Sequence, residues 1–195
     1  MMIERHRVAI MVIERLISMK TLFLLRHAKS SWANPGQADH ERPLNERGRK
    51  AAVAMGRYIG GLPSQPGLIL ASTAKRVEET LDLLLAELGA DVPVIRDREL
   101  YLATPDGLLS RLHMTSRNPS NLMIIGHNPG IHEFALQLSG EVVDGDAYEA
   151  RRRMKAAYPT AALAIIRFSD ARTWRDVAFR KGSLMSFTVP RDLKS

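Results

Sequence analysis

Three short apolar segments constrain the fold of this chain most strongly, because each one ends in polar residues just before a helix-like segment. They are TLFLLRH (21–27), GLILAS (67–72) and NLMIIGH (121–127). Runs this short and this apolar are typical of strands that are buried on both faces of a sheet. Such strands alternate with helices in α/β proteins, so the pattern predicts an α/β domain.

The segments between these runs have the features of helices. Residues 46–60 follow Asn45, a residue type that caps helices, and residues 74–89 repeat apolar side chains at helical spacing before Gly89. Further helices are expected over 105–115 and 130–140, and further strands over 92–95, 160–168, 174–180 and 183–189. We therefore expect a three-layer α/β/α sandwich with a mostly parallel central sheet, formed by residues 19–195 as a single domain.

The first 18 residues differ from the rest of the chain. Their apolar run covers only Val8–Ile13, which is too short for a membrane span, and no small-residue cleavage site follows it. We expect residues 1–18 to be a dispensable extension or to follow an upstream start codon. The alternative is a short amphipathic helix that packs on the domain.

Composition narrows the classes of function. The 195 residues include no cysteine, which excludes disulfides, thiolate nucleophiles and cysteine metal sites and fits a cytoplasmic protein. The net charge of +7 is scattered, with RRRMK (151–155) as its one cluster and no basic stripe interleaved with aromatic residues. We expect no nucleic-acid or membrane partner, and an anionic substrate explains the charge equally well. The oligomeric state stays open.

Cationic and polar side chains follow each of the three apolar strands. Arg26 and His27 end the first, Ser72 ends the second with Arg76 just beyond it, and His127 ends the third. Ligands of α/β sheets bind where the carboxyl ends of strands meet the amino ends of helices. Two arginines and two histidines at such an edge predict a pocket for a tetrahedral dianion, above all phosphate, which arginine grips with two hydrogen bonds.

The same charges predict a role for His27. Clustered cations disfavour another positive charge, so its imidazole should be neutral and carry a free lone pair. A neutral imidazole can attack phosphorus while its other nitrogen donates to a backbone carbonyl. We expect phosphoryl transfer through a phosphohistidine, with Arg26, Arg76 and His127 stabilising the equatorial oxygens. No metal or other cofactor is expected, because the cations already supply the charge that a magnesium ion would bring.

Four motifs, in order, resemble those of one known family. They are LFLLRHAKSSW (22–32), DHERPLNERGRKAA (39–52), ASTAKRVEET (71–80) and IIGHNPGI (124–131). Together they resemble the histidine phosphatase (phosphoglycerate mutase-like) superfamily, and within it the SixA-like phosphohistidine phosphatases. The resemblance covers about residues 20–192.

The resemblance implies a role for each matching residue. His27 matches the nucleophile, Arg26 and Arg76 the phosphate-binding arginines, and His127 the second histidine at the phosphoryl group. The match for the acid that protonates the leaving group is Glu99, with Asp106 as the second candidate.

The implied activity is a cofactor-independent phosphatase of phosphohistidine in proteins. Small phosphorylated metabolites are alternative substrates. A mutase is a weaker alternative, and a module that only binds phosphate or nucleic acid is another, although a binding module would need no nucleophile.

Overall fold

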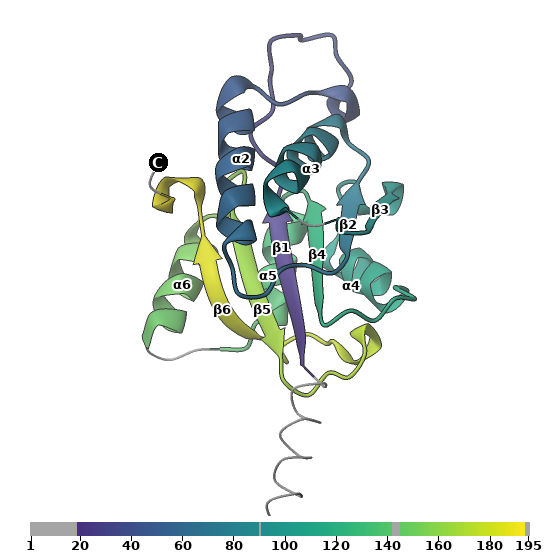
Figure 1. The fold of residues 1–195 in the computed structure, drawn as a ribbon, viewed down its shortest axis with the longest axis vertical. Coiled ribbons are helices and arrows are strands. Elements are labelled where there is room, and N and C mark those ends of the chain that lie inside the picture. The colour runs from purple at the N-terminus through teal and green to yellow at the C-terminus, as the bar shows by residue number, and fades with distance from the viewer. Residues whose placement is uncertain (1–18, 90, 142–144, 194–195) are drawn as a thin grey trace, which may run out of the picture.

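The core of the structure, a computed structural model that describes residues 19–89, 91–141 and 145–193, is a six-stranded sheet (Figure 1). Its strand order is β3-β2-β4-β1-β5-β6. The strands are β1 (Lys20–Arg26), β2 (Ile69–Ser72), β3 (Val94–Asp97), β4 (Asn121–Gly126), β5 (Leu163–Phe168) and β6 (Ser183–Thr188). The three predicted apolar strands lie side by side as β2, β4 and β1, at the centre of the sheet where both faces are covered.

The sheet is mixed, which corrects the prediction of a mostly parallel one. The four strands β1, β2, β3 and β4 all run in the same direction. β5 runs antiparallel to both of its neighbours, β1 and β6. Parallel neighbours need a crossover connection, and each parallel connection here contains a helix. The segment between β5 and β6 contains no such crossover helix, so these two strands meet in opposite directions.

The predicted strand over 174–180 is also wrong. Trp174–Asp176 form a short 3₁₀ helix, η3, and the buried Trp174 indole donates to the carbonyl of Pro119. The carboxylate of Asp176 accepts from the backbone N–H groups of Arg172 and Thr173, which holds this turn closed. The apolar residues of this segment therefore face the core from a turn.

Helices cover both faces of the sheet, as the three-layer prediction requires (Figure 1). α2 (Glu46–Gly60) and α3 (Lys75–Leu88) pack against the face that carries Phe23 and Leu25. α4 (Pro105–His113), α5 (Gly130–Leu138) and α6 (Gly145–Ala156) pack against the face that carries Leu22 and Leu24. The alternation of these β1 side chains between two cores follows from the two-residue period of a strand.

The carboxyl ends of β1, β2 and β4 meet at one edge of the sheet. Arg26 pairs in register with Gly126, and β2 is parallel to β4. β6 runs antiparallel to β5 and therefore also ends at this edge, followed by the 3₁₀ helix η4 (Pro190–Asp192). The predicted extension, 1–18, lies outside the described residues. Within the described ranges, no helix is both long enough and apolar enough to cross a bilayer.

Candidate active site

The end of β1 holds His27 in a fixed position through its backbone. The His27 N–H donates to the carbonyl of Gly126 at 3.1 Å, which continues the pairing of β1 with β4. The His27 carbonyl accepts from Ala161 at 3.1 Å, and the next N–H, of Ala28, donates to the Thr80 hydroxyl at 3.0 Å. Three different segments therefore hold the chain on both sides of this histidine.

The start of α2 packs directly on the loop that follows His27. The Asn45 N–H donates to the carbonyl of Lys29 at 3.0 Å, and the Asn45 side chain caps the helix by accepting from the Gly48 N–H at 2.8 Å. A Cβ at position 48 would overlap the Lys29 carbonyl. Only glycine allows this close approach, which explains the glycine of the RPLNERG segment.

The imidazole of His27 has the geometry of a neutral nucleophile. Its Nδ1 lies 2.7 Å from the carbonyl oxygen of Ala28, so Nδ1 carries the proton and donates it there. Its Nε2 accepts from the Nε–H of Arg76 at 3.2 Å, so Nε2 carries the lone pair. Burial, and then the nearby guanidinium groups, lower the pKa of His27 to about 4.

His127 lies beside His27, and their ring centroids are 5.1 Å apart. Its Nε2 is 2.8 Å from the Ser72 hydroxyl, and its Nδ1 is 3.2 Å from Nη2 of Arg76. Burial, followed by the charges of His27 and Arg76, lowers the pKa of His127 to about 3. A bound dianion would counter the effect of those cations and favour the protonated ring, which could then donate to it.

Two arginines supply the charge of the pocket. Arg76 is buried, and its guanidinium contacts both histidines. Arg26 donates from Nη1 to the carbonyl of Tyr158 at 2.8 Å, while its buried Nε has no hydrogen-bond partner among the described residues. Burial and the charge of Arg76 lower the pKa of Arg26. An anion between the two guanidiniums would relieve this repulsion.

Two further residues belong to this cluster that sequence reasoning did not identify. Arg76 donates from Nη1 to the backbone carbonyl of Asp39 at 2.5 Å and from Nη2 to the Asp39 carboxylate at 2.9 Å. The hydroxyl of Tyr101 donates to the same carboxylate at 2.7 Å, and this bond is the largest cause that lowers the pKa of Asp39. Tyr101 also packs edge-on against His127, with ring centroids 5.2 Å apart.

The sequence contains a partial indication of Asp39 and Tyr101, because each lies in or near a segment already singled out. Asp39 opens the DHERPLNERGRKAA motif, and Tyr101 follows Glu99 by two residues. Asp39 and Tyr101 are 62 residues apart in the chain. Contacts over such separations depend on the tertiary fold, and no local pattern contains them.

The two candidate acids lie outside this hydrogen-bonded cluster. Glu99 is exposed in the 3₁₀ helix η2 (Arg98–Leu100), and its N–H donates to the Asp97 side chain. Asp106 is exposed in the first turn of α4. Neither carboxylate bonds to His27 or His127 in the described part of the chain. Glu99 is the better placed of the two along the chain, because its neighbour Tyr101 reaches the cluster.

The structure thus brings together four of the five predicted site residues, His27, His127, Arg26 and Arg76. The arrangement combines a buried lone-pair donor with two guanidiniums that can bind a tetrahedral anion. Within the described residues, no group of three or more histidine, aspartate or glutamate side chains could hold a metal ion.

Comparisons with known proteins agree with this geometry. The family model of the histidine phosphatase superfamily (branch 1) matches residues 22–101, which include Arg26, His27 and Arg76. An uncharacterised protein of Mycobacterium tuberculosis is 34% identical over 168 residues, which are 86% of this chain and 100% of that protein.

Two solved structures are similar over most of their length. One, assigned as the phosphohistidine phosphatase SixA of Nakamurella multipartitia, has a TM-score of 0.73 and 26% identity, covering 88% of this chain and 96% of that one. The other, assigned as SixA of Agrobacterium tumefaciens, has a TM-score of 0.71 and 29% identity, covering 88% and 98%.

Proposed function

This chain belongs to the histidine phosphatase superfamily and is SixA-like, and we propose that it hydrolyses phosphohistidine in proteins through a covalent intermediate on His27. The membership supports phosphatase activity. The choice of substrate and the role of each residue are our proposal. We also propose that it acts in the cytoplasm, since the chain has no cysteine that an oxidising compartment would pair.

One observation carries the proposal, namely the orientation of the His27 ring. The Ala28 carbonyl fixes the proton on Nδ1, so the lone pair of Nε2 faces the Arg76 guanidinium. A pocket that only binds phosphate gains nothing from a nitrogen lone pair directed at the anion. A nucleophile requires that lone pair, and the low pKa of His27 keeps it available at neutral pH.

In the first step, Nε2 of His27 attacks the phosphorus atom of the substrate. The bond between phosphorus and the substrate imidazole breaks, and the electron pair of that bond leaves with the imidazole nitrogen, which takes up a proton. Arg76, Arg26 and a protonated His127 donate to the three equatorial oxygens, where negative charge accumulates. The Arg76 Nε–H moves from His27 to a phosphoryl oxygen, which frees the attacking lone pair.

In the second step, water attacks the phosphoryl group on His27 and releases one of its protons to solvent. The phosphorus–nitrogen bond breaks, inorganic phosphate forms, and the electron pair returns to Nε2. The same donors serve this step, because the phosphorus passes through the same geometry in reverse.

Glu99 is our candidate for the acid that protonates the leaving group. Its exposed position in η2 makes it a weak match for a substrate that releases an alkoxide, which needs a well-placed proton donor. An imidazole is a better leaving group, and solvent can protonate it. The contrast between an exposed acid and a buried anion pocket supports a phosphorus–nitrogen substrate.

The test is a hydrolysis screen with EDTA present. Phosphohistidine peptides are compared with alkyl and aryl phosphate monoesters, using the native chain and His27→Ala. We expect the highest kcat/KM for phosphohistidine, no loss in EDTA and no turnover by His27→Ala. A preference for one small phosphomonoester would overturn the substrate assignment, and turnover that needs a divalent ion would overturn the mechanism.

A further inference from the structure

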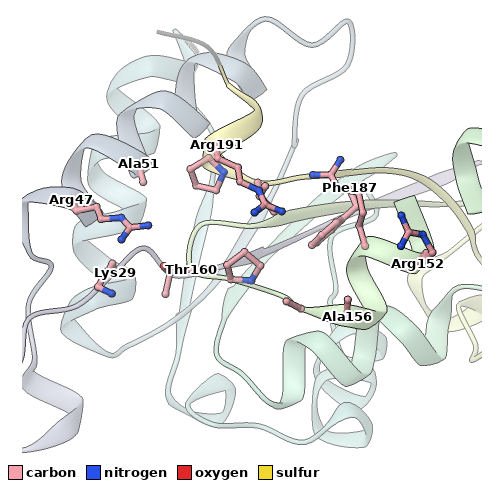
Figure 2. Close-up of a pocket in the computed structure, with 13 residues that line it drawn as sticks. Lys29, Arg47, Ala51, Arg152, Ala156, Thr160, Phe187 and Arg191 are labelled. Carbon is pink, nitrogen blue, oxygen red and sulfur yellow. The ribbon is translucent and has the colours of Figure 1, made fainter. Parts of the chain in front are cut away.

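A second cationic cleft opens near the same edge of the sheet. Its cavity of about 410 Å³ falls within the size range of small-molecule sites. It lies between the first turns of α2, the last turns of α6 and the end of β6 (Figure 2). The lining residues include Lys29, Arg47, Arg152, Thr160, Phe187 and Arg191.

All the charged side chains that line this cleft are cationic. Arg152 and Arg153 pair with Glu149 and Asp192. Lys29, Arg47 and Arg191 have no acidic partner among the described residues, and all three are exposed. Like charges gathered at one opening repel one another, so an anion bound between them is favoured.

The remaining lining is largely apolar. Phe187 and Val189 are buried side chains of β6 and the residues after it, and prolines and alanines complete the walls. Figure 2 shows Arg47 and Lys29 at one end of the cleft, Arg152 and Phe187 toward the other, and Arg191 between them. Charges over an apolar floor suit a ligand that carries an anionic group on an apolar or planar body.

The cleft is distinct from the His27 cluster but shares its supporting chain. Lys29 follows His27 by two residues, and Thr160 precedes Ala161, which donates to the His27 carbonyl. None of the cleft side chains bonds to His27, Arg76 or His127 within the described residues. The phosphoryl chemistry proposed above does not use this cleft.

We propose that the cleft lined by Arg47, Arg191 and Phe187 binds an organic anion, with its phosphate or carboxylate among the arginines and its apolar part on Phe187. Such an anion is either the distal part of the substrate or a separate small molecule. Guanidinium groups suit both anion types, because they donate two parallel hydrogen bonds to a planar or tetrahedral oxyanion.

The binding test uses 8-anilinonaphthalene-1-sulfonate, a fluorescent probe with one anionic group on aromatic rings. We expect saturable binding to the full chain with one strong site. Arg47→Glu and Arg191→Glu should each weaken this binding by about tenfold or more, because each places a carboxylate beside the sulfonate. Arg47 lies in the first turn of α2, where an acid is compatible with the helix, so this variant should fold.

Two control variants make the result specific. Arg117→Glu makes the same change in charge in the loop before β4. This loop lies at the end of the sheet where β4 begins, opposite the carboxyl ends of the parallel strands, so the variant should keep full binding. Arg76→Ala removes the anion grip of the proposed catalytic pocket and should also keep it. Equal binding by Arg47→Glu and the native chain would overturn the proposal, as would loss of binding in Arg76→Ala alone.

The two sources of the anion, the distal part of the substrate and a separate small molecule, predict different kinetic results. If the cleft holds the distal part of the substrate, Arg47→Glu raises the KM for a phosphohistidine peptide, whereas a separate ligand leaves that KM unchanged. In both cases Arg117→Glu, which makes the same change in charge outside the cleft, should turn over p-nitrophenyl phosphate at the native kcat. Probe binding needs no turnover, so failure of the cleft proposal and failure of the phosphatase proposal are measured separately.

Discussion

At the scale of single residues, the proposed chemistry depends on the protonation of two buried rings, His27 and His127. His27 has a pKa lowered to about 4 and His127 a pKa lowered to about 3, mainly by burial. Lowered values mean that both rings are neutral at pH 7 and gain protons only in strong acid. Nε2 of His27 therefore keeps its lone pair until the pH falls through about 4, and nucleophilic activity should be lost below that value.

A titration of the imidazole carbons by NMR tests this prediction. We expect His27 to titrate near pH 4 and His127 near pH 3 in the empty site, with both values rising when inorganic phosphate is added. The single variants His27→Gln and His127→Gln assign the two signals. A His27 signal that titrates at its ordinary value near 6.5 would contradict a desolvated, cation-flanked nucleophile.

A second residue-scale prediction concerns Glu99. Glu99→Gln removes a proton donor from an exposed position and leaves the buried pocket intact. Because alkoxides need protonation more than imidazoles or aryl oxides do, we expect hydrolysis of alkyl phosphate monoesters to slow by about tenfold or more, and of phosphohistidine much less. The ratio of kcat/KM between the two substrates is the measurement.

Asp106→Asn is the matched control for Glu99→Gln. It removes the second candidate carboxylate, in the first turn of α4. Equal losses on all substrates in Glu99→Gln would make Glu99 a residue of positioning or stability. A selective loss in Asp106→Asn instead would transfer the role of acid to Asp106.

At the scale of elements, the 3₁₀ helix η1 (Asp39–Glu41) sits against the anion pocket. Its Asp39 carboxylate contacts Arg76 at 2.9 Å and Arg42 at 2.7 Å. Arg42 also donates to the Ser30 hydroxyl and the Ser31 carbonyl, so it anchors η1 to the loop after His27. The Asp39 carboxylate thus pairs with the guanidinium that we propose binds the phosphoryl group, so the two anions should compete for Arg76.

Removing that competitor gives the third prediction. Asp39→Asn should tighten competitive inhibition by inorganic phosphate by about threefold to tenfold, because one negative charge leaves a pocket that binds a dianion. Glu41→Gln is the control, since Glu41 lies in the same element but pairs with His40. Weaker inhibition in Asp39→Asn would mean that Asp39 orients Arg76 and does not compete with phosphate.

Local sequence signals predicted most elements because the evidence for them is local. Asn45 caps α2 as expected, and the apolar runs became β1, β2 and β4. The helix α6 was not predicted, since its residues are strongly polar and only Met154 is buried. The direction of β5 was not predicted either, because a buried strand has the same apolar sequence pattern whether it pairs in parallel or antiparallel.

The candidate site divides in the same way. His27, Arg26, Arg76 and His127 could be predicted, because each follows a recognisable strand or opens a helix at one sheet edge. Asp39 and Tyr101 were missed because their contacts join residues far apart in the chain. Asp39 and Arg76 are separated by 37 residues, and Tyr101 and Asp39 by 62. The strand pattern predicts which strand ends converge at one end of the sheet. The positions of the loops around those strand ends depend on the tertiary fold.

At the scale of the whole molecule, the proposed domain begins at Met19. β1 starts at Lys20, whose ammonium donates to the carbonyls of Asn118 and Pro119, and every proposed site residue lies after it. A chain from Met19 to Ser195 should therefore keep the native kcat and melt within about 2 °C of the full chain. A much lower Tm, measured by circular dichroism, would show that residues 1–18 pack on the domain.

The covalent intermediate on His27 is the claim on which the rest of the chemistry depends. Its most direct test is to mix the enzyme with a ³²P-labelled phosphohistidine peptide, quench in alkali within the first turnover, and locate the label by mass spectrometry. We predict label on His27 that is stable to alkali and lost in acid, and none in folded His27→Ala, which should also lack turnover. Label on another residue, or turnover by His27→Ala, would contradict the mechanism.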